Sequence, residues 1–458
     1  MARDESQTVD DLTVAPRRSA APRRPGAIVL FAGGEPMMRV LPSEGARVPL
    51  GRDALAALDL SDARVSRNHA ECTWDAGVWR VRDLGSRNGT AVDGRPCASE
   101  PIVTGASAVV RIGDTVVWLV PDVGPHEETP VHFEGRTAVG ATFGAVLAQV
   151  ASAAEGRVLH LTGPSGAGKE VAARAFHEQS AVARGPFVPI NCAAIPEGVA
   201  ERVLFGAKKG SFSGAHADAT GHLQEAHGGT LFLDELGELD LQVQGKLLRA
   251  LEAREIIPIG ASKPIAIDVR FCSATHKDLR TAVAAKTFRE DLYFRIARPV
   301  VTIPPLAARQ EEIPVIVDRE VRALGMVPHA SLIEACLLRP WPGNVRELLV
   351  EVAAAARAAA AAGDGRVRST DLADHAGIAF DPGPPASGSE PERPSGPPAR
   401  PVKKEMPGRE AIVEALRRNE GRVASAARDL GLHRNQLRRW IAANDVDPRQ
   451  FGDASDEG

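Results

Sequence analysis

The sequence predicts a multidomain protein: an N-terminal β-sandwich, a central α/β domain with a helical lid, and a C-terminal all-α domain. Residues 27–121 are short apolar runs separated by turn signals, with no convincing helix between them. After residue 138, five apolar strand candidates alternate with helical stretches, which is typical of a parallel sheet. Residues 407–445 carry apolar side chains at helical spacing together with many arginines. The 458 residues suffice for about three domains.

The composition excludes several classes of protein. With 44% hydrophobic and 25% charged residues, the chain can bury several cores. The net charge of −4 gives no bulk attraction to nucleic acid or membrane, and 4% aromatic residues disfavour a stacking surface for single strands. No apolar run approaches the roughly 20 residues of a membrane helix, so no membrane partner is expected. Five scattered cysteines without a CxxC pair argue against a disulfide scaffold or zinc site and favour a reducing cytoplasm.

Polar and breaker-rich stretches set the expected domain boundaries. Residues 1–25 lack periodicity and are expected to be a disordered tail, since their arginine pairs precede too short an apolar run for an export signal. Residues 122–137 are expected to be a polar linker. Residues 381–405, dense in Pro, Gly and Ser, predict an extended linker. The expected domains are 27–121, 138–378 with a lid from about residue 306, and 407–445.

Each strand of the central sheet is predicted from an apolar run of four to seven residues. The predicted strands are Val158–Thr162, Phe187–Asn191, Thr230–Leu233, Ile267–Ser273 and Pro299–Ile303.

A phosphate-binding loop is predicted between the first of these strands and the helical stretch that follows it. The sequence GPSGAGKE allows backbone N–H groups to approach phosphate oxygens, and the helix N-terminus adds positive potential. Lys169 is expected to reach the β- and γ-phosphates of ATP. The general motif has Ser or Thr after this lysine, whereas here the residue is Glu170. The predicted ATP-binding residues of the loop are Gly163, Pro164, Ser165, Gly166, Ala167, Gly168, Lys169 and Glu170.

A second acidic motif, GGTLFLDE, ends the third predicted strand with Asp234 and Glu235. The carboxyl end of such a strand lies beside the phosphate loop in a parallel sheet. Asp234 is therefore expected to hold Mg²⁺, and Glu235 to polarise the attacking water. The alternative is an acidic pair that merely ends the strand.

Five motifs in a fixed order carry a family resemblance. GPSGAGKE, GSFSGA (210–215), GGTLFLDE, FREDLYFR (288–295) and WPGNVREL (341–348) resemble those of bacterial enhancer-binding proteins, the AAA+ activators of sigma-54 RNA polymerase. The resemblance covers residues 138–378, and that family also carries Glu after the loop lysine. It implies an ATPase with Mg²⁺ as cofactor that acts as an oligomeric, probably hexameric ring. The ring would remodel the closed complex of sigma-54 RNA polymerase.

The resemblance also implies roles for single residues. Asn191 is similar to the residue that restrains the catalytic glutamate, and Thr275 to sensor I. Arg346 resembles sensor II of the lid. Arg289 and Arg295 resemble the arginines that reach the γ-phosphate of a neighbouring subunit, where a cation stabilises the transferring phosphoryl group. Surface ion pairing is the alternative for these two arginines.

The GSFSGA segment resembles the GAFTGA loop that touches sigma-54 in this family. Its glycines permit hinging and its phenylalanine offers an apolar tip. Two serines depart from the usual form, and Lys208 and Lys209 make the loop more basic. Also, the Arg-Glu pair common before Arg309 is missing. A remodeller that does not act through sigma-54 therefore stays open as an alternative. The predicted loop residues are Gly210, Ser211, Phe212, Ser213, Gly214 and Ala215.

Three loop motifs near the N-terminus resemble the forkhead-associated (FHA) domain, which reads phosphothreonine. They are Gly51-Arg52, SRNH (66–69) and LGSRNGT (84–90). Arginine and hydroxyl groups suit a phosphate with three acceptor oxygens. His69 is expected to brace a loop from behind and Trp79 to lie in the core. A sandwich used only for packing is the alternative. The predicted phosphothreonine-binding residues are Arg52, Ser66, Arg67, Arg87 and Asn88.

The C-terminal stretch resembles the Fis-type helix-turn-helix. Gly431-Leu432 separates the predicted helices 423–430 and 433–442, and the second is rich in arginine and amide side chains. Such side chains bind base edges and phosphates of an upstream DNA site, although a merely solvated helix face is the alternative. The predicted DNA-binding residues are Arg434, Asn435, Gln436, Arg438 and Arg439.

Together these motifs predict a sigma-54-dependent transcriptional activator that couples phosphothreonine sensing to ATP hydrolysis at a specific DNA site. The second alternative is an FHA-gated DNA-binding regulator whose AAA+ core only forms oligomers.

Overall fold

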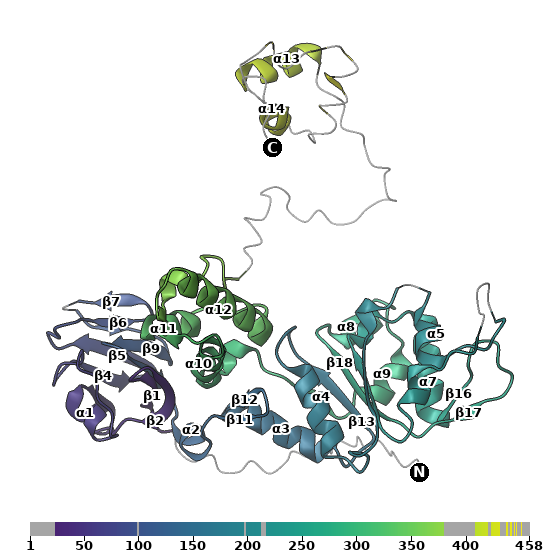
Figure 1. Cartoon of the computed structure of the whole chain (residues 1–458), viewed down its shortest axis with the longest axis horizontal. Helices are drawn as coiled ribbons and strands as arrows, with labels where there is room; N and C mark the ends of the chain where they lie inside the picture. The colour runs from purple at the N-terminus through teal and green to yellow at the C-terminus, as the bar shows by residue number, and fades with distance from the viewer. Residues whose placement is uncertain are drawn as a thin grey trace, which may run out of the picture. The chain divides into compact units, whose positions relative to one another are not determined.

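The computed structural model describes residues 23–98, 100–196, 198–211, 217–379, 408–419 and 423–430, and residues 437, 440, 441, 444, 446 and 450 (Figure 1). The chain divides into two compact units, residues 1–381 and 382–458. The predicted fold class is confirmed, because the first unit contains a β-sandwich and a parallel α/β sheet and the second is helical.

The N-terminal module is a sandwich of two antiparallel sheets. Trp79 is fully buried between them, as expected, because its strand alternates buried and exposed residues. One short helix, α1 (Arg52–Ala56), interrupts the strands where no helix was expected. The six-stranded sheet runs β2 (Glu35–Val40), β1 (Gly26–Ala32), β10 (Thr115–Val120), β9 (Ala108–Ile112), β6 (Thr90–Val92), β7 (Arg95–Cys97). The four-stranded sheet runs β3 (Arg47–Leu50), β4 (Ala70–Asp75), β5 (Val78–Asp83), β8 (Ile102–Val103).

The segment expected to be a polar linker has secondary structure of its own. It forms α2 (Gly124–Glu128) and a hairpin of β11 (His132–Glu134) and β12 (Thr137–Val139). Val139 is buried against the helix that follows it, so the hairpin belongs to the core of the α/β domain.

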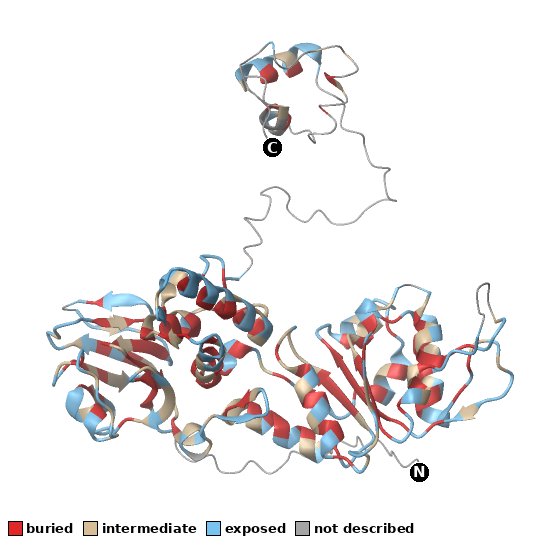
Figure 2. Cartoon of the chain, in the orientation of Figure 1, coloured by how far each residue is buried: buried red, intermediate tan, exposed pale blue. Residues whose placement is uncertain are grey.

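The α/β domain contains a five-stranded parallel sheet with all five predicted strands. The strand order places β13, which precedes the phosphate loop, between β18 and β19. Buried residues fill the strands and the helix faces that pack on them (Figure 2). The strands are β14 (Phe187–Asn191), β15 (Thr230–Asp234), β18 (Arg270–Thr275), β13 (Val158–Thr162) and β19 (Val300–Thr302). The accompanying helices are α3 (Ala141–Ala153), α4 (Lys169–Glu178), α5 (Ala200–Phe205), α6 (His222–Glu225), α7 (Leu241–Ala253), α8 (Leu279–Ala284) and α9 (Glu290–Ile296).

The lid consists of three helices and a two-stranded parallel pair. Its helices are α10 (Ile313–Ala323), α11 (Ala330–Leu338) and α12 (Asn344–Ala361), and its strands are β20 (Val327–Pro328) and β21 (Arg366–Val367). Alanines 355, 356 and 359 of α12 are buried, which lets this helix approach its neighbours closely. Trp341 fixes the turn before α12, since its ring is buried and its Nε1 donates to the carbonyl of Cys336.

In the C-terminal unit, the structure describes α13 (Arg409–Arg418) and α14 (Val423–Asp429), which match the first two predicted helices. Ile412 and Leu416 pack with Ala426, Leu437 and Ile441 in a small apolar core. Within the described residues, no helix combines the length and apolar character that crossing a membrane requires. All five cysteines lie in the first unit as buried free thiols.

Candidate functional site

A pocket of about 610 Å³ lies where the phosphate loop, the carboxyl ends of the strands and the lid meet. Its lining combines the loop lysine and the acidic pair with apolar and charged side chains from the hairpin and the lid. Predicted site residues in its lining are Ser165, Gly166, Ala167, Gly168, Lys169, Glu170, Asn191, Asp234, Glu235 and Arg346.

The loop GPSGAGKE wraps from β13 into the N-terminus of α4, as predicted. Gly166 and Gly168 have φ angles of 73° and 105°, which favour glycine. A Cβ on Gly166 would also lie 2.2 Å from the Gly343 carbonyl oxygen of the lid. Lys169 is 7% exposed, and its Nζ donates to the carbonyls of Gly163 and Pro164 at 3.1 and 3.2 Å.

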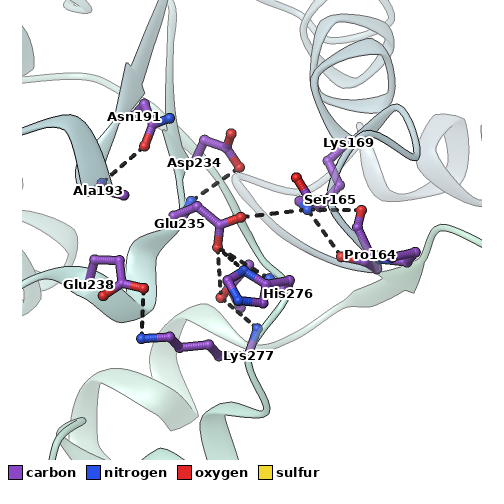
Figure 3. A network of polar contacts seen from close by, with 12 residues as sticks. Pro164, Ser165, Lys169, Asn191, Ala193, Asp234, Glu235, Glu238, His276 and Lys277 are labelled. Atoms are coloured by element: carbon purple, nitrogen blue, oxygen red, sulfur yellow. Dashed lines mark hydrogen bonds and ion pairs between the residues drawn. The ribbon is translucent and has the colours of Figure 1, made fainter. Parts of the chain in front are cut away.

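The acidic pair stands at the end of β15, next to the loop lysine (Figure 3). Glu235 has a φ of 53°, an unusual backbone angle for a residue with a side chain, and its Oε1 lies 3.8 Å from Lys169 Nζ. Its Oε2 accepts hydrogen bonds from His276 Nδ1 at 2.8 Å and from Thr275 Oγ1 at 3.4 Å (Figure 3). The predicted sensor I residue and the catalytic glutamate are therefore in direct contact.

The pKa values of the two carboxyl groups are shifted in opposite directions. Burial, followed by the nearby Glu235, raises the pKa of Asp234 despite the opposing charge of Lys169. Burial also acts to raise the pKa of Glu235, but the hydrogen bonds from His276 and the charge of Lys169 outweigh it and lower that pKa. The geometry thus keeps Glu235 ionised as a hydrogen-bond acceptor.

Asn191 lines the same pocket from the end of β14. Its Oδ1 accepts a hydrogen bond from Ala193 N at 3.0 Å (Figure 3). The hydrogen bonds described for the Glu235 carboxylate come instead from Thr275 and His276. Asn191 was predicted as the partner of the glutamate, whereas the structure shows His276 in that contact.

The lid contacts the phosphate loop through three polar side chains. Arg346 Nη1 donates to Ser165 Oγ at 3.2 Å, which places the predicted sensor II residue in the pocket. Asn344 Nδ2 donates to the Ser165 carbonyl at 2.9 Å. Arg309 Nη2 donates to the Ala167 carbonyl at 2.8 Å. Neither Asn344 nor Arg309 was predicted as a site residue, although both lie in or near motifs that the sequence displays.

Arg309 is buried beside an equally buried carboxylate. Its Nη1 donates to Glu312 Oε2 at 3.2 Å, and its guanidinium lies 4.7 Å from the ring centre of Phe143. Glu312 also accepts from Gly140 N at 3.1 Å, at the start of α3. Burial raises the pKa of Glu312 to about 7, against the opposing effect of Arg309. Both members of this buried pair belong to the lid, and each bonds to the backbone of the α/β domain, Arg309 at Ala167 and Glu312 at Gly140.

Asp234 provides a carboxylate suited to Mg²⁺, which is typically held by one or two carboxylates and the phosphates of the nucleotide. Among the described residues, no cluster of three or more His, Cys, Asp or Glu side chains could form a metal cage of its own. Glu170, at the position of the usual Ser or Thr, pairs with Arg174 at 2.7 Å. The donor set thus fits a cation that arrives with the nucleotide.

Arg289 and Arg295 do not line this pocket. Arg289 is exposed and forms hydrogen bonds with Asp291 at 2.7 and 3.0 Å. Arg295 is also exposed, and borders a separate recess beside Arg157.

A second site candidate lies where the loops of the sandwich meet. Arg52 is exposed and reaches the Val65 carbonyl with Nη2 at 3.1 Å. Ser66 Oγ accepts from Arg87 N at 3.2 Å, so two of the predicted motifs touch. Asn88 Nδ2 donates to the Arg64 carbonyl at 2.6 Å. Arg67 and Arg87 are exposed, which leaves their guanidinium groups on the surface of this loop cluster.

His69 braces the loop cluster from behind, as predicted. It is fully buried, its Nδ1 accepts from Ser66 N at 3.0 Å, and its Nε2 lies 3.0 Å from the Gly89 carbonyl. Since Nδ1 accepts a backbone N–H, Nε2 carries the proton and donates to that carbonyl. Gly51 is required by packing, because a Cβ there would lie 2.0 Å from the Arg67 carbonyl oxygen.

Comparison with protein families gives three matches along the chain. Residues 48–113 match the FHA domain, residues 139–303 match the Sigma-54 interaction domain, and residues 409–442 match the bacterial regulatory protein, Fis family. The central domain of this chain is a Sigma-54 interaction domain. The predicted order of its domains is that of the three matches.

Two relatives that the chain resembles match less than half of its length. The Nif-specific regulatory protein of Herbaspirillum seropedicae is 47% identical over 214 residues, which are 44% of this chain and 39% of that protein. The regulator NtrC of Azospirillum brasilense is 45% identical over 195 residues, 41% of this chain and 40% of that protein. The chain thus spans about two fifths of the length of these curated relatives. A crystal structure of NtrX from Brucella abortus with ADP has 28% identity and a TM-score of 0.49, covering 69% of this chain and 70% of that one.

Two predicted sites of this chain lie partly or wholly outside the described residues. In the GSFSGA loop, the structure describes Gly210 and Ser211 but not residues 212–215. The predicted DNA-reading residues Arg434, Asn435, Gln436, Arg438 and Arg439 also fall outside the described part.

Proposed function

We propose that this regulator hydrolyses ATP in an oligomeric, hexameric ring and thereby remodels the closed complex of sigma-54 RNA polymerase. One observation carries the proposal: Lys169, the Asp234–Glu235 pair and the lid residue Arg346 surround a single pocket. These are the groups that phosphoryl transfer to water requires, namely cations for the phosphates and an acceptor for the nucleophile.

Within the pocket, each group has a separate task. Lys169 contacts the β- and γ-phosphates, and Arg346 reports their presence to the lid. Glu235 is ionised, and its His276 and Thr275 hydrogen bonds orient it so that it can accept a proton from the attacking water. Asp234 would hold Mg²⁺, which supplies positive charge to the phosphate oxygens when bound. Asn191 ends β14 and is paired with Asp234 in the register of the sheet, and from this position it would restrain Glu235.

Arg289 and Arg295 serve the pocket of an adjacent subunit in this proposal. Both are exposed, and neither lines the pocket of its own chain. A cation supplied by the neighbour makes hydrolysis depend on assembly. The GSFSGA loop, Gly210–Ala215, would contact sigma-54 and move with the state of the nucleotide.

The flanking domains provide the inputs. The exposed arginines 52, 67 and 87, with Ser66 and Asn88, form a phosphothreonine site on the sandwich, where guanidinium groups make charge-assisted hydrogen bonds to phosphate. The Fis-type domain binds an upstream DNA site through Arg434, Asn435, Gln436, Arg438 and Arg439. The five free thiols support a reducing, cytoplasmic location.

The decisive experiment measures ATP hydrolysis by the full-length protein from dilute to concentrated solution. Specific activity is expected to rise steeply with concentration, and Lys169→Ala to abolish hydrolysis. The exposed Lys286→Ala is the matched control. Constant specific activity over a hundredfold range would contradict the shared pocket. Transcription from a sigma-54 promoter with purified polymerase then tests the target, and ATP hydrolysis without open-complex formation would favour a different remodelling substrate.

A further inference from the structure

The outer face of the six-stranded FHA sheet is apolar and covered by the ATPase lid. Strand β1 is buried along its whole length, which is unusual for a sandwich strand because one face normally meets solvent. Ala27 and Val29 face the sandwich core, whereas Ile28 and Leu30 belong to the same apolar cluster as the lid helices. The FHA sheet and the lid therefore share one hydrophobic core.

Polar contacts fix the register of this interface. Arg111 of β9 pairs with Glu334 of α11 at 2.5 Å, and the carboxylate is only 8% exposed. Arg322 of α10 donates from Nη2 to the Gly34 carbonyl, in the turn between β1 and β2, at 2.9 Å. Ion pairs removed from solvent define orientation, because a displaced partner leaves a buried charge.

The lid helix that meets the FHA sheet also lines the nucleotide pocket. Ile316 and Arg319 of α10 border that pocket, one turn before Arg322. Arg319 Nη1 additionally donates to the Gly135 carbonyl of the hairpin at 2.9 Å. A change of lid position on nucleotide binding therefore acts directly on the FHA interface.

On the FHA side, a chain of polar contacts leads from the interface to the predicted phosphothreonine loops. His329, at the N-terminus of α11, lies with Nε2 3.3 Å from Asp114 Oδ1. The same oxygen accepts from Arg64 Nη1 at 3.2 Å. The Arg64 carbonyl in turn accepts from Asn88 Nδ2 at 2.6 Å. One carboxylate thus joins the lid to the segment that positions Asn88.

We propose that the lid and the FHA domain are coupled across their shared core, and that the Asn88–Arg64–Asp114–His329 contacts link phosphothreonine binding to the nucleotide state. The inference rests on the nucleotide and phosphothreonine sites proposed above. Coupling between two sites is reciprocal. A phosphopeptide that orders the FHA loops therefore favours one lid position and changes the affinity for the nucleotide. The nucleotide changes the affinity for the phosphopeptide by the same factor.

Hydrogen–deuterium exchange of the full-length protein with and without ADP tests this coupling. Saturating ADP is expected to protect residues 163–170 and to change exchange at least twofold in the loop segments 62–69 and 84–89. Asp114→Ala should abolish the response in the loops while the protection of 163–170 persists. Asp75→Ala removes a carboxylate from a surface pair on the same domain and should leave both responses intact.

The outcomes separate the two proposals. Loops that ignore ADP in the wild type, while residues 163–170 are protected, overturn the coupling. No protection of residues 163–170 overturns nucleotide binding itself. If Asp114→Ala does not fold, the interface is tested with Arg111→Glu, Glu334→Arg and the double exchange. Loss of the loop response in each single variant and its return in the double variant supports the coupling, and an unchanged response in all three overturns it.

Binding of a fluorescent, degenerate phosphothreonine peptide pool provides the reverse measurement, with the unphosphorylated pool as control. ADP should change the apparent affinity of the phosphorylated pool at least twofold in the wild type and not in Asp114→Ala. Equal affinity with and without ADP in the wild type overturns the coupling. Absence of any phosphate-dependent binding overturns the proposed phosphothreonine site instead.

Discussion

Arg309 of the lid donates a hydrogen bond to the carbonyl oxygen of Ala167 in the phosphate loop, over 142 residues of sequence. The guanidinium is 2% exposed and also pairs with Glu312, which is 1% exposed. The loop that would hold ATP is thus fixed from behind by a charged group that water does not reach. Any change in the lid that moves Arg309 moves the loop.

Arg309→Met is expected to destabilise the ATPase domain strongly, because it removes the hydrogen bond to the Ala167 carbonyl and leaves the buried Glu312 without its partner, so that Glu312 must take up a proton to stay buried. Removing one member of a buried pair costs about 3–5 kcal/mol, or roughly a 10 °C fall in the melting temperature of a domain this size. Arg309→Met/Glu312→Leu removes both charges and should recover most of the loss. Thermal unfolding measures both, and a double variant as unstable as the single one would show that the pair is not the cause.

Glu235→Gln should keep nucleotide binding and lose hydrolysis, since the amide cannot accept the proton of water. General-base catalysis typically contributes about 10²–10⁴-fold, so kcat is expected to fall in that range. A fall in ADP affinity as large as the fall in kcat would instead indicate that Glu235 serves nucleotide binding.

His276→Ala should move the acid limb of the pH–rate profile to higher pH. The side-chain hydrogen bond from His276 Nδ1 lowers the pKa of Glu235, so its removal lets that pKa rise and protonation begin at higher pH, although the bond from the backbone N–H of residue 276 remains. His222→Ala, which removes an exposed histidine paired with Glu225, should leave the profile in place. Steady-state ATPase rates from pH 5 to 9 test the difference, and two superimposable profiles for wild type and His276→Ala would contradict it.

Gly166→Ala is expected to lower ADP affinity at least tenfold, about 1.4 kcal/mol. Its Cβ would collide with the Gly343 carbonyl oxygen, so the lid and the loop would have to separate. Gly144→Ala in α3 is the matched control, because its Cβ would meet only Val139 at 3.7 Å. Calorimetric titration with ADP compares the two, and similar affinities would mean that the lid yields without cost.

His160 predicts acid sensitivity of the ATPase domain. Burial in β13, an inner strand of the sheet, lowers the pKa of His160 from 6.5 to about 4. The folded state therefore holds the ring neutral, so its contribution is complete above about pH 6.5 and is lost as the pH falls to 4. That pKa difference corresponds to about 3 kcal/mol. His160→Gln should flatten the fall of melting temperature between pH 6.5 and 4, whereas the exposed His132→Gln should not. An equally steep fall in His160→Gln would exclude this residue as the cause.

The central sheet was predictable because local signals agree there. Apolar runs such as Val158–Thr162 stand directly before glycine-rich or acidic motifs, and the structure reproduces this run as β13 with the same bounds. The loop lysine and the Asp234–Glu235 pair were expected together because parallel strands end at one edge. Their proximity is a consequence of topology alone.

The lid contacts were not predictable in the same way. Arg309 and Asn344 reach the loop through hydrogen bonds that span 142 and 179 residues, and no periodicity reports such a distance. The contact of His276 with Glu235 was not predictable either, because it depends on the turn that follows β18. The hairpin of β11 and β12 was not predicted, because the polar composition of residues 122–137 indicates a linker and the two strands are only three residues long.

One signal in the N-terminal module was available. The runs AIVLFA and TVVWLV are apolar at both odd and even positions, which indicates strands that are buried on two faces. A solvent-exposed sandwich would have alternated. The element that covers the outer face of these strands is the lid, whose first helix begins at Ile313.

The covered outer face of the FHA sheet has a practical consequence for dissecting this protein. Deleting the sandwich would remove the cover from α10 and α11 and expose apolar side chains of the cluster that they share with the FHA sheet. Patches of that kind promote self-association. An ATPase fragment beginning near residue 138 is therefore expected to aggregate, and its inactivity would reveal nothing about whether the missing sandwich activates or inhibits.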